Sequence, residues 1–300
     1  MLINFCNICG SDRIQYYGTT RCIEFCVPPG VEMRRQLFKC KMCDSINIFP
    51  IPRNEILHLY YNNCAMAQVV TKRWDNRTVT PIIIELSRIK GEGKVLDIGC
   101  GNGSLLDLLP PSLEKYGVEI AESAVAEAKT KNIKVFSMPW ELAEFDCQFD
   151  LIIALDFLEH ITDPWFSFKK MVDFLRPDGL LVIETGNADS FIARSLKEDW
   201  GYVALFGHLC ALSTKALIFY SENANVRVLK IAKGNHYRIN PRIILYRGML
   251  AYGFRVIKKC YSLLKNKQLA KNTIFYNILN RSPIQAPLPD HMIFVGQKLT

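Results

Sequence analysis

Three glycines alternate with other residues directly after a short apolar run. Gly99, Gly101 and Gly103 follow residues 94–98, which are typical of a short buried strand. Glycine lets the backbone turn sharply and approach a ligand closely. A second predicted strand ends at Glu119, 20 residues after Gly99, where a carboxylate can accept hydrogen bonds from both hydroxyls of a ribose. The pattern therefore predicts a site for a nucleoside-bearing cofactor.

The spacing of these glycines argues against a dinucleotide. Dinucleotide-binding loops have the pattern Gly-x-Gly-x-x-Gly and place a pyrophosphate at the N-terminus of the following helix. Here the pattern is Gly-x-Gly-x-Gly, and Asp97 ends the strand beside that position. A carboxylate there suits a cationic amino-acid group better than a diphosphate.

The segments around this loop resemble motifs of the class I S-adenosylmethionine-dependent methyltransferases. The resemblance rests on Val95–Gly103, Glu119, Phe149–Leu155 and Leu175–Ile183. It implies S-adenosylmethionine as cofactor and a doubly wound α/β fold, with a seven-stranded Rossmann-like sheet whose last strand is antiparallel. Residues 138–140, after the third strand, are expected to touch the adenine ring. The expected cofactor contacts are Asp97, Gly99, Gly101, Asn102, Gly103, Glu119, Met138, Pro139 and Leu155.

Cysteine pairs near the N-terminus have the spacing of a metal site. Two Cys-x-x-Cys turns are separated by 30 residues, and each such turn can deliver two thiolates to one tetrahedral ion. We therefore predict a small zinc ribbon with a closed, structural zinc site. Between the turns, Cys22 and Cys26 are interpreted either as a second half-site or as apolar filler. The predicted zinc ligands are Cys6, Cys9, Cys40 and Cys43.

The resemblance narrows to one branch of the methyltransferases. A zinc ribbon ahead of the core, together with Asp156–Pro164, Glu184–Ser190 and Trp200–Leu209, is similar to enzymes of surface-polysaccharide and antibiotic-sugar gene clusters, including deoxysugar C-methyltransferases. Those relatives usually have proline where this chain has Gly186. The resemblance implies that the methyl acceptor is a sugar, a nucleotide-sugar or a lipid-linked glycan, methylated on oxygen or carbon.

Catalytic candidates follow the fourth and fifth strands, because the acceptor in this architecture lies beyond the carboxyl ends of the strands. Methyl transfer to oxygen or carbon requires alignment and removal of a proton. Glu159, His160 and His208 are the candidates, and by resemblance His208 occupies the place of a catalytic histidine in sugar methyltransferases. Two alternatives stay open for the segment that follows the fourth strand. Asp156, Glu159 and His160 hold a divalent cation, as a similar segment in quinone O-methyltransferases suggests, or His160 caps the next helix and Glu159 pairs with a basic neighbour.

Four further aromatic residues fall outside these motifs. Tyr60 and Tyr61 resemble a tyrosine-containing linker that reaches toward the substrate in the family, although a packing role is the alternative. His236 and His291 lie near expected strand ends and are assigned no role.

The motifs divide the chain into four parts. We predict a zinc ribbon over residues 1–50 and a linker with a cap helix over 51–90, and the resemblance implies that the helix itself spans about residues 81–90. The methyltransferase domain is expected to comprise 91–232 and 290–300. A basic helical insertion over 233–289 is expected to interrupt it before the last strand.

The basic charge is concentrated in this insertion. Thirteen Lys and Arg residues and no Asp or Glu lie between residues 223 and 289, although the net charge of the whole chain is only +8. Basic and aromatic faces of a predicted helix over 241–264 favour docking of residues 241–281 on an anionic membrane surface. A polyanionic partner, a solvated helix face and a dimer contact are the alternatives.

Several classes of protein are disfavoured. We find no apolar stretch long enough for a transmembrane helix and no secretory signal peptide. The sequence therefore predicts a cytoplasmic protein that is peripheral, through its basic segment, to the inner face of the membrane. Nucleic acid is an unlikely substrate, because Leu155-Asp156-Phe157 differs from the Asp/Asn-Pro-Pro-aromatic signature of exocyclic amino methylation. A cofactor-binding protein without catalysis is the alternative outside the enzymes.

Overall fold

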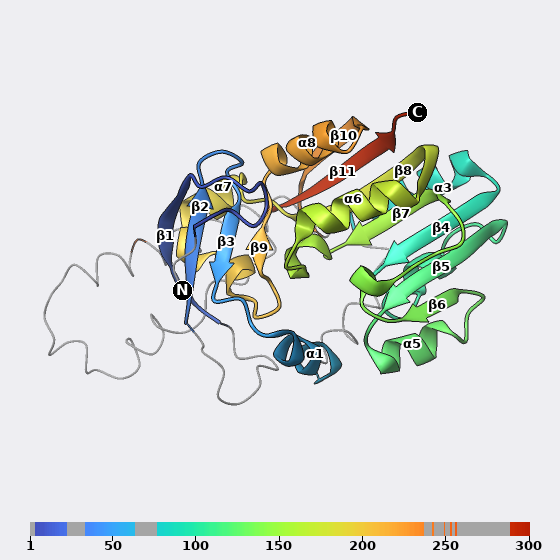
Figure 1. Cartoon of the computed structure of the whole chain (residues 1–300), viewed down its shortest axis with the longest axis horizontal. Helices are drawn as coiled ribbons and strands as arrows, with labels where there is room; N and C mark the ends of the chain where they lie inside the picture. The colour runs from blue at the N-terminus through green and yellow to red at the C-terminus, as the bar shows by residue number, and fades with distance from the viewer. Residues whose placement is uncertain are drawn as a thin grey trace, which may run out of the picture.

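The computed structural model describes residues 4–22, 34–63, 77–236, 242, 249, 253, 256 and 289–300. Two β-sheets organise this part of the chain (Figure 1). A seven-stranded sheet occupies one end of the molecule, and a four-stranded sheet, built mainly from the N-terminal residues, lies at the other end.

The larger sheet has the predicted topology. Its parallel strands are joined to an antiparallel strand, β11, which runs against both of its neighbours, β8 and β10. The prediction of a seven-stranded sheet with an antiparallel last strand is therefore confirmed. In spatial order the strands are β10 (Val226–Gly234), β11 (His291–Lys298), β8 (Leu175–Gly186), β7 (Phe149–Leu155), β4 (Gly93–Ile98), β5 (Leu113–Glu119) and β6 (Lys134–Ser137).

Helices connect the strands, and some of them begin at a side-chain cap. The Asp163 side chain accepts a hydrogen bond from the backbone N–H of Phe166, and Pro164 occupies the first turn of the same helix. The helices are α1 (Asn54–Asn63), α3 (Thr80–Lys90), α4 (Ser104–Asp107), α5 (Glu122–Ala128), α6 (Pro164–Phe174), α7 (Phe191–Leu196) and α8 (Thr214–Asn223). Among the described residues, 3₁₀ turns accompany them: η3 (Trp140–Leu142), η4 (Leu158–His160), η5 (Lys197–Asp199) and η6 (Gly201–Ala204).

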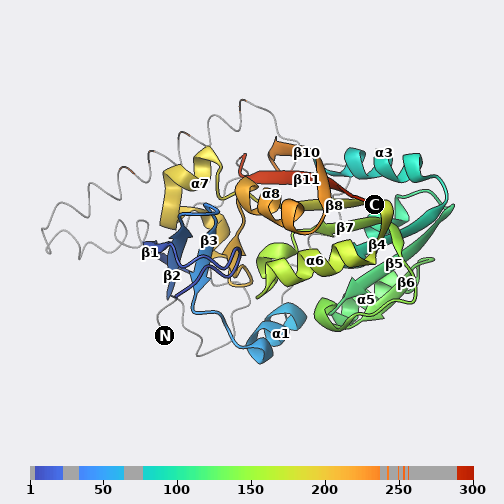
Figure 2. The same ribbon diagram turned by 45° about the horizontal axis from the view of Figure 1, so that its top comes forward.

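Both faces of the large sheet are buried. Figure 2 shows α3 and α6 on opposite sides of the strands. Along β7, Ile153 faces the α3 side and packs in one core with Ile83, whereas Ile152 faces the other side and packs with Phe168 of α6. Neighbouring residues of a strand point to opposite faces. Continuous apolar runs in β7 and β8 follow from this double coverage.

The small sheet takes one strand from far along the chain. Its order is β1 (Ile14–Arg21), β2 (Arg34–Cys40), β3 (Ile46–Phe49) and β9 (Cys210–Ala211). The pairing of β3 with β9 brings Ile46 opposite Ala211. Cys210 and Ala211 therefore complete the sheet that the N-terminal residues begin.

A buried arginine fixes the loop that precedes β9. Arg35 of β2 is 1% exposed. Its Nη1 donates hydrogen bonds to the carbonyl oxygens of Phe206 at 2.9 Å and His208 at 2.8 Å. The backbone N–H of Ile48 also donates to the carbonyl of Leu209 at 3.2 Å. The N-terminal sheet thus positions the loop that carries His208.

The predicted basic insertion lies almost wholly outside the described residues. Within it the structure describes the end of β10 through residue 236, the start of the last segment at residue 289, and four helical positions, 242, 249, 253 and 256. Membrane docking through 241–281 stays a prediction. Over the described ranges, no helix is both long enough and apolar enough to cross a membrane.

Replacing the buried arginine tests the coupling between the sheet and the loop. Arg35→Met leaves two buried carbonyls without a donor, so we expect it to lower the free energy of unfolding by about 2 kcal/mol. Urea titration measures the loss. Arg34→Met, at the exposed neighbouring position, is the control and is expected to change stability by less than about 0.5 kcal/mol. Equal stability of the two variants would contradict the coupling.

Candidate active site

The glycine loop has the backbone geometry that its sequence predicts. Gly99, Gly101 and Gly103 have φ values of 74°, 53° and 74°, in the left-handed region that favours glycine. Glu119, at the end of β5, accepts hydrogen bonds from the backbone N–H groups of Gly101 at 2.9 Å and of Ile120 at 2.8 Å. These bonds hold the carboxylate beside the loop, at the carboxyl ends of β4 and β5.

A second carboxylate at this edge is deeply buried. Asp97 of β4 is 3% exposed. Burial, reinforced by the nearby charge of Glu119, raises the pKa of Asp97 to about 8, and the Arg77 guanidinium opposes this rise only in part. A cationic ligand group beside Asp97 would favour its ionised form.

The Asn102 side chain makes hydrogen bonds at the start of α4. Its side-chain oxygen accepts hydrogen bonds from the Ser104 N–H at 3.2 Å and the Ser104 hydroxyl at 2.6 Å, and its amide donates to Glu127 at 2.7 Å. These bonds fix the side chain between the glycine loop and the following helices. Its part in cofactor binding stays a prediction.

The remaining predicted cofactor contacts follow β6 and β7. Met138 and Pro139 are half-buried after β6, and Leu155 is 8% exposed at the end of β7. Trp140 is 2% exposed and packs against Phe174, with ring centroids 6.3 Å apart. An indole ring placed in the core does not fit the expectation that it contacts adenine.

The three predicted catalytic residues meet in one place, which we call the histidine–glutamate cluster: Glu159, His160 and His208. Their side-chain ligand atoms lie within 4.8 Å of one another. The two imidazole rings are 4.7 Å apart at 83°. His160 is half-buried, whereas His208 is 6% exposed.

Hydrogen bonds define the form of His160. Its Nδ1 lies 2.9 Å from the carbonyl oxygen of Gly207, which can only accept, so Nδ1 carries a hydrogen. The Tyr61 hydroxyl lies 3.0 Å from the same nitrogen and donates to the same carbonyl at 3.3 Å. Burial lowers the pKa of His160 below its ordinary value. The neutral ring therefore keeps its lone pair on Nε2.

Tyr60 and Tyr61 both reach the cluster region. The Tyr60 ring packs against Phe206 at 5.1 Å and against Tyr61 at 5.3 Å. A Cβ on Gly207 would lie 2.9 Å from Tyr60 and 3.0 Å from His160, so glycine is needed for this close approach. Tyr60 has the packing role, while Tyr61 makes the polar contact.

Within the cluster, burial favours the uncharged form of the Glu159 carboxyl. It is fully buried, and burial, with a smaller contribution from Asp156, raises its pKa to about 7. One oxygen accepts from the Thr185 hydroxyl at 2.9 Å, and the other has no hydrogen-bond partner among the described residues. No ion pair forms between Glu159 and a basic side chain in the described ranges, and Asp163 caps α6 in place of His160.

A second group of polar side chains lies on the other face of the sheet. We call it the carboxylate–histidine network: Arg77, Asp156, Glu184, His236 and His291. Arg77, just before α3, donates from Nη2 to Asp156 at 2.8 Å and to Glu184 of β8. His236 lies 3.6 Å from Asp156, and its ring is 4.8 Å from that of His291.

Charges in this network depend strongly on one another. Burial alone would raise the pKa of Asp156, but the Arg77 guanidinium, together with His236 and His291, holds that pKa below its ordinary value. Burial raises the pKa of Glu184 to about 7 and lowers that of His236 to about 4. Burial would lower the pKa of His291, but its hydrogen bond to Asp290 and the charges of the surrounding carboxylates together raise that pKa to about 9.

The predicted cation-binding set of Asp156, Glu159 and His160 is divided between the two groups. Asp156 has a φ of 49°, which turns the chain directly after β7, and its carboxylate pairs with Arg77. Glu159 and His160 lie in the next turn, η4, on the side of the N-terminal sheet. Sequence reasoning missed Arg77, and it assigned no role to His236 or His291.

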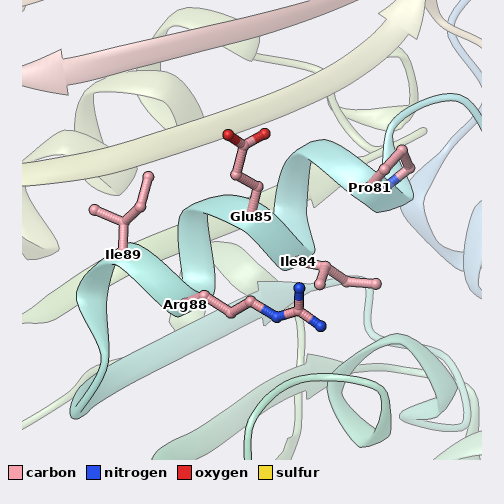
Figure 3. A pocket seen from close by; sticks show the side chains of 5 residues that line it. All are labelled: Pro81, Ile84, Glu85, Arg88 and Ile89. Carbon is pink, nitrogen blue, oxygen red and sulfur yellow. The ribbon is translucent and has the colours of Figure 1, made fainter.

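A surface depression of about 440 Å³ lies on the outer face of α3, away from both groups. Figure 3 shows its lining side chains along one helix. They are Pro81, Ile84, Glu85, Arg88 and Ile89.

The buried Asp97 carboxylate gives a pH-dependent prediction. Because its folded-state pKa lies above its unfolded value, stability is present at low pH and is lost as the pH rises toward about 8. In cofactor-free protein, Asp97→Asn should therefore gain on the order of 2 kcal/mol over the wild type between about pH 5 and pH 8. Thermal unfolding measures this gain.

Added S-adenosylmethionine should reverse the ranking, since the variant lacks the carboxylate that a cationic group needs. The exposed Asp107→Asn is the control and should track the wild type. A stability difference independent of pH would contradict the role of the Asp97 charge.

Comparison with known proteins agrees with this geometry. A family described as Methyltransferase domain matches residues 71–231, more than half of the chain. (S)-coclaurine N-methyltransferase of Papaver somniferum is 27% identical over 172 residues, covering 52% of this chain and 49% of that protein. A Coxiella burnetii ubiquinone biosynthesis O-methyltransferase is 34% identical over 172 residues, covering 50% of this chain and 69% of that protein.

The match thus spans about half the length of the coclaurine enzyme. Among solved structures, a chain of the complex between the Haloferax volcanii Trm112 methyltransferase activator and a methyltransferase is similar in fold. Its TM-score is 0.52 at 12% identity, covering 83% of this chain and 100% of that chain. The chain belongs to the methyltransferase-domain family, and its seven-stranded sheet forms an S-adenosylmethionine-dependent methyltransferase domain.

Proposed function

We propose that the protein transfers a methyl group from S-adenosylmethionine to a hydroxyl oxygen of a sugar or glycan, with His160 as the base. The observation that carries the proposal is the fixed, neutral form of His160. The Gly207 carbonyl holds the hydrogen on Nδ1 at 2.9 Å, and burial keeps the ring uncharged. Nε2 therefore has a lone pair ready to accept a proton.

The proposed step is a displacement at a sulfonium carbon. The acceptor oxygen forms a bond to the methyl carbon while the carbon–sulfur bond breaks. The electron pair of the broken bond stays on sulfur, which gives S-adenosylhomocysteine. The hydroxyl proton passes to Nε2 of His160. A weak base is sufficient, because the hydroxyl becomes acidic only as the new bond forms. Removal of a proton from carbon would need a stronger base, so we favour oxygen over carbon.

His160 is preferred to His208 on the basis of exposure. His208 is 6% exposed, and its pKa lies far below the ordinary value because of burial and the neighbouring His160. His160 is half-buried and can reach an acceptor from the protein surface. We assign His208 and Glu159 the role of positioning the His160 ring.

The sugar assignment draws on the residues that surround this edge of the sheet. Both polar groups of side chains offer many donors and acceptors, which suits a ligand with several hydroxyls. The resemblance to enzymes of sugar gene clusters favours the same acceptor class. Of the two relatives compared above, the ubiquinone enzyme is described as an O-methyltransferase and the coclaurine enzyme as an N-methyltransferase.

Removing the base tests the mechanism. His160→Gln is expected to lower kcat by about 100- to 10,000-fold with little change in S-adenosylmethionine affinity. In the wild type, the acid limb of the kcat profile should fall below the ordinary histidine pKa of about 6.5, since burial lowers the pKa of His160. The variant should lose that limb. A variant with wild-type turnover would eliminate His160 as the base.

The acceptor class is tested separately. Purified protein with S-adenosylmethionine is offered nucleotide-sugars, lipid-linked glycans, catechols and amines, and product NMR locates the methyl group. O-methylated sugar is the expected product. Methylated catechol or amine alone would overturn the sugar assignment. Cofactor binding without turnover on any acceptor would favour a non-catalytic binding protein.

We also propose that the four cysteines of the small sheet hold zinc. Their ligand atoms lie within 4.8 Å of one another, with Cys6 and Cys43 sulfurs 3.7 Å apart and Cys9 and Cys40 sulfurs 3.6 Å apart. A tetrahedral site with zinc–sulfur bonds of about 2.3 Å has sulfur–sulfur separations of about 3.8 Å. Asn47 donates to the Cys6 sulfur at 3.4 Å, which is the kind of support that bound thiolates receive.

Cys22 does not belong to this group of ligand atoms. Cys22 is buried in a separate apolar group with Leu57, Tyr60 and Phe206. Its position supports the interpretation as apolar filler. Cys26 lies outside the described residues.

Metal analysis checks the zinc proposal. The purified chain is expected to contain about one tightly held zinc, and Cys40→Ser should lose most of it. A strong chelator should lower the melting temperature of the wild type, because structural metal binding contributes folding free energy. Cys147→Ser, in the methyltransferase domain, is the matched control. Zinc content unaffected by Cys40→Ser would rule out this ligand set.

A further inference from the structure

Three ligand-type side chains converge at the carboxyl edge of the large sheet, apart from the histidine–glutamate cluster. Asp156 follows β7, His236 follows β10, and His291 begins β11. Their ligand atoms lie within 4.8 Å of one another. All three belong to the carboxylate–histidine network, and their sequence motifs predicted no combined role for them.

The contact between Asp156 and His236 suits a shared ligand better than a hydrogen bond. Oδ1 of Asp156 lies 3.6 Å from Nδ1 of His236, which is too long for a hydrogen bond. Two ligand atoms that bind the same tetrahedral metal ion, each about 2.1 Å from the ion, lie about 3.4 Å apart. The side chains are 26% and 17% exposed, so an ion and a further ligand can reach them.

His291 is oriented as a metal-binding histidine would be. Its Nδ1 lies 2.9 Å from Oδ1 of Asp290, so the carboxylate holds one ring nitrogen and leaves Nε2 for an ion. Asp290 is fixed in turn, because its Oδ2 accepts from the Trp200 indole at 2.7 Å. A carboxylate behind a histidine in this way sets the ring orientation in many metal sites.

Carboxyl groups surround the three ligand side chains. Asp156, Glu184 and Asp290 contribute carboxyl groups, and Arg77 is the cation that contacts the first two of them. The Arg77 contact uses Oδ2 of Asp156 and leaves Oδ1 toward the histidines. Oε1 of Glu184 is fully buried and accepts no hydrogen bond from the described residues. A buried oxygen without a partner is costly unless a ligand or solvent supplies one.

We propose that Asp156, His236 and His291 bind a divalent first-row transition cation, in the arrangement of two histidines and one carboxylate that leaves coordination positions open. The open positions would take oxygen atoms of the methyl acceptor beside the cofactor edge. This role rests on the proposed function, whereas binding of the cation does not. The site differs from the predicted set of Asp156, Glu159 and His160, which the fold divides.

Cobalt binding tests the site on the full chain. The protein, with its cysteine-bound metal retained, is dialysed against Co²⁺ without cofactor or acceptor, and visible absorption is recorded. We expect about one further Co²⁺ per chain, without the sulfur-to-cobalt charge-transfer absorption that occupation of the cysteine site would give. Because no methyl transfer is measured, failure of the proposed function would leave this result unaffected.

Substitutions then locate the ion. His236→Ala and His291→Ala should each weaken Co²⁺ binding by at least about 10-fold, and Asp290→Asn, which keeps all three ligands, by about 10- to 100-fold. His160→Gln should bind Co²⁺ as the wild type does. Thermal unfolding and S-adenosylmethionine affinity confirm that each variant is folded. A wild type that takes up no further Co²⁺, or histidine variants with wild-type affinity, would overturn the proposal.

Discussion

The geometry of the active-site region depends on one constraint, the alternation of side chains along β8. Glu184 and Thr185 are consecutive, both are fully buried, and they point to opposite faces of a sheet that is covered on both sides. Each polar group must then find a partner on its own face, because burial without one is costly. The two networks form around these two residues.

On the α3 side, the partner of Glu184 is Arg77. One guanidinium nitrogen contacts the carboxylates of both Glu184 and Asp156. The charge of the same guanidinium also opposes the rise in the pKa of Asp97. On the opposite side, Thr185 donates to Glu159 and lies 3.1 Å from the Tyr202 hydroxyl. One side of the sheet edge is thus charged, while the other holds groups that burial keeps close to neutral.

The sequence predicted most of the sheet because the apolar runs and glycine turns are local signals. Phe149–Leu155 matches β7, and the cap helix expected over residues 81–90 matches α3 to within one residue. Glu159, His160 and His208 were expected near the carboxyl ends of the strands as separate candidates, and the structure brings all three together. The division of the chain into four parts is not tested by these elements.

What the sequence could not supply was the partner of each buried polar residue. Arg77 lies ahead of the expected core and carries no motif, so nothing local connects it with Glu184, 107 residues away. His236 and His291 become neighbours only because β10 and β11 pair in antiparallel register. The indole of Trp140 was misplaced for a similar reason, since its aromatic neighbour Phe174 lies in α6.

The far strand of the small sheet sets an order of events during synthesis. Arg35 contacts Phe206 across 171 residues, and β9 closes the sheet at the same place. The cysteine-bearing hairpins leave the ribosome long before these partners exist. Their last strand and the acceptors of Arg35 arrive only after five strands of the large sheet have been made. Contacts of such long sequence separation form slowly, so we expect the N-terminal unit and the His208 loop to be completed late in folding.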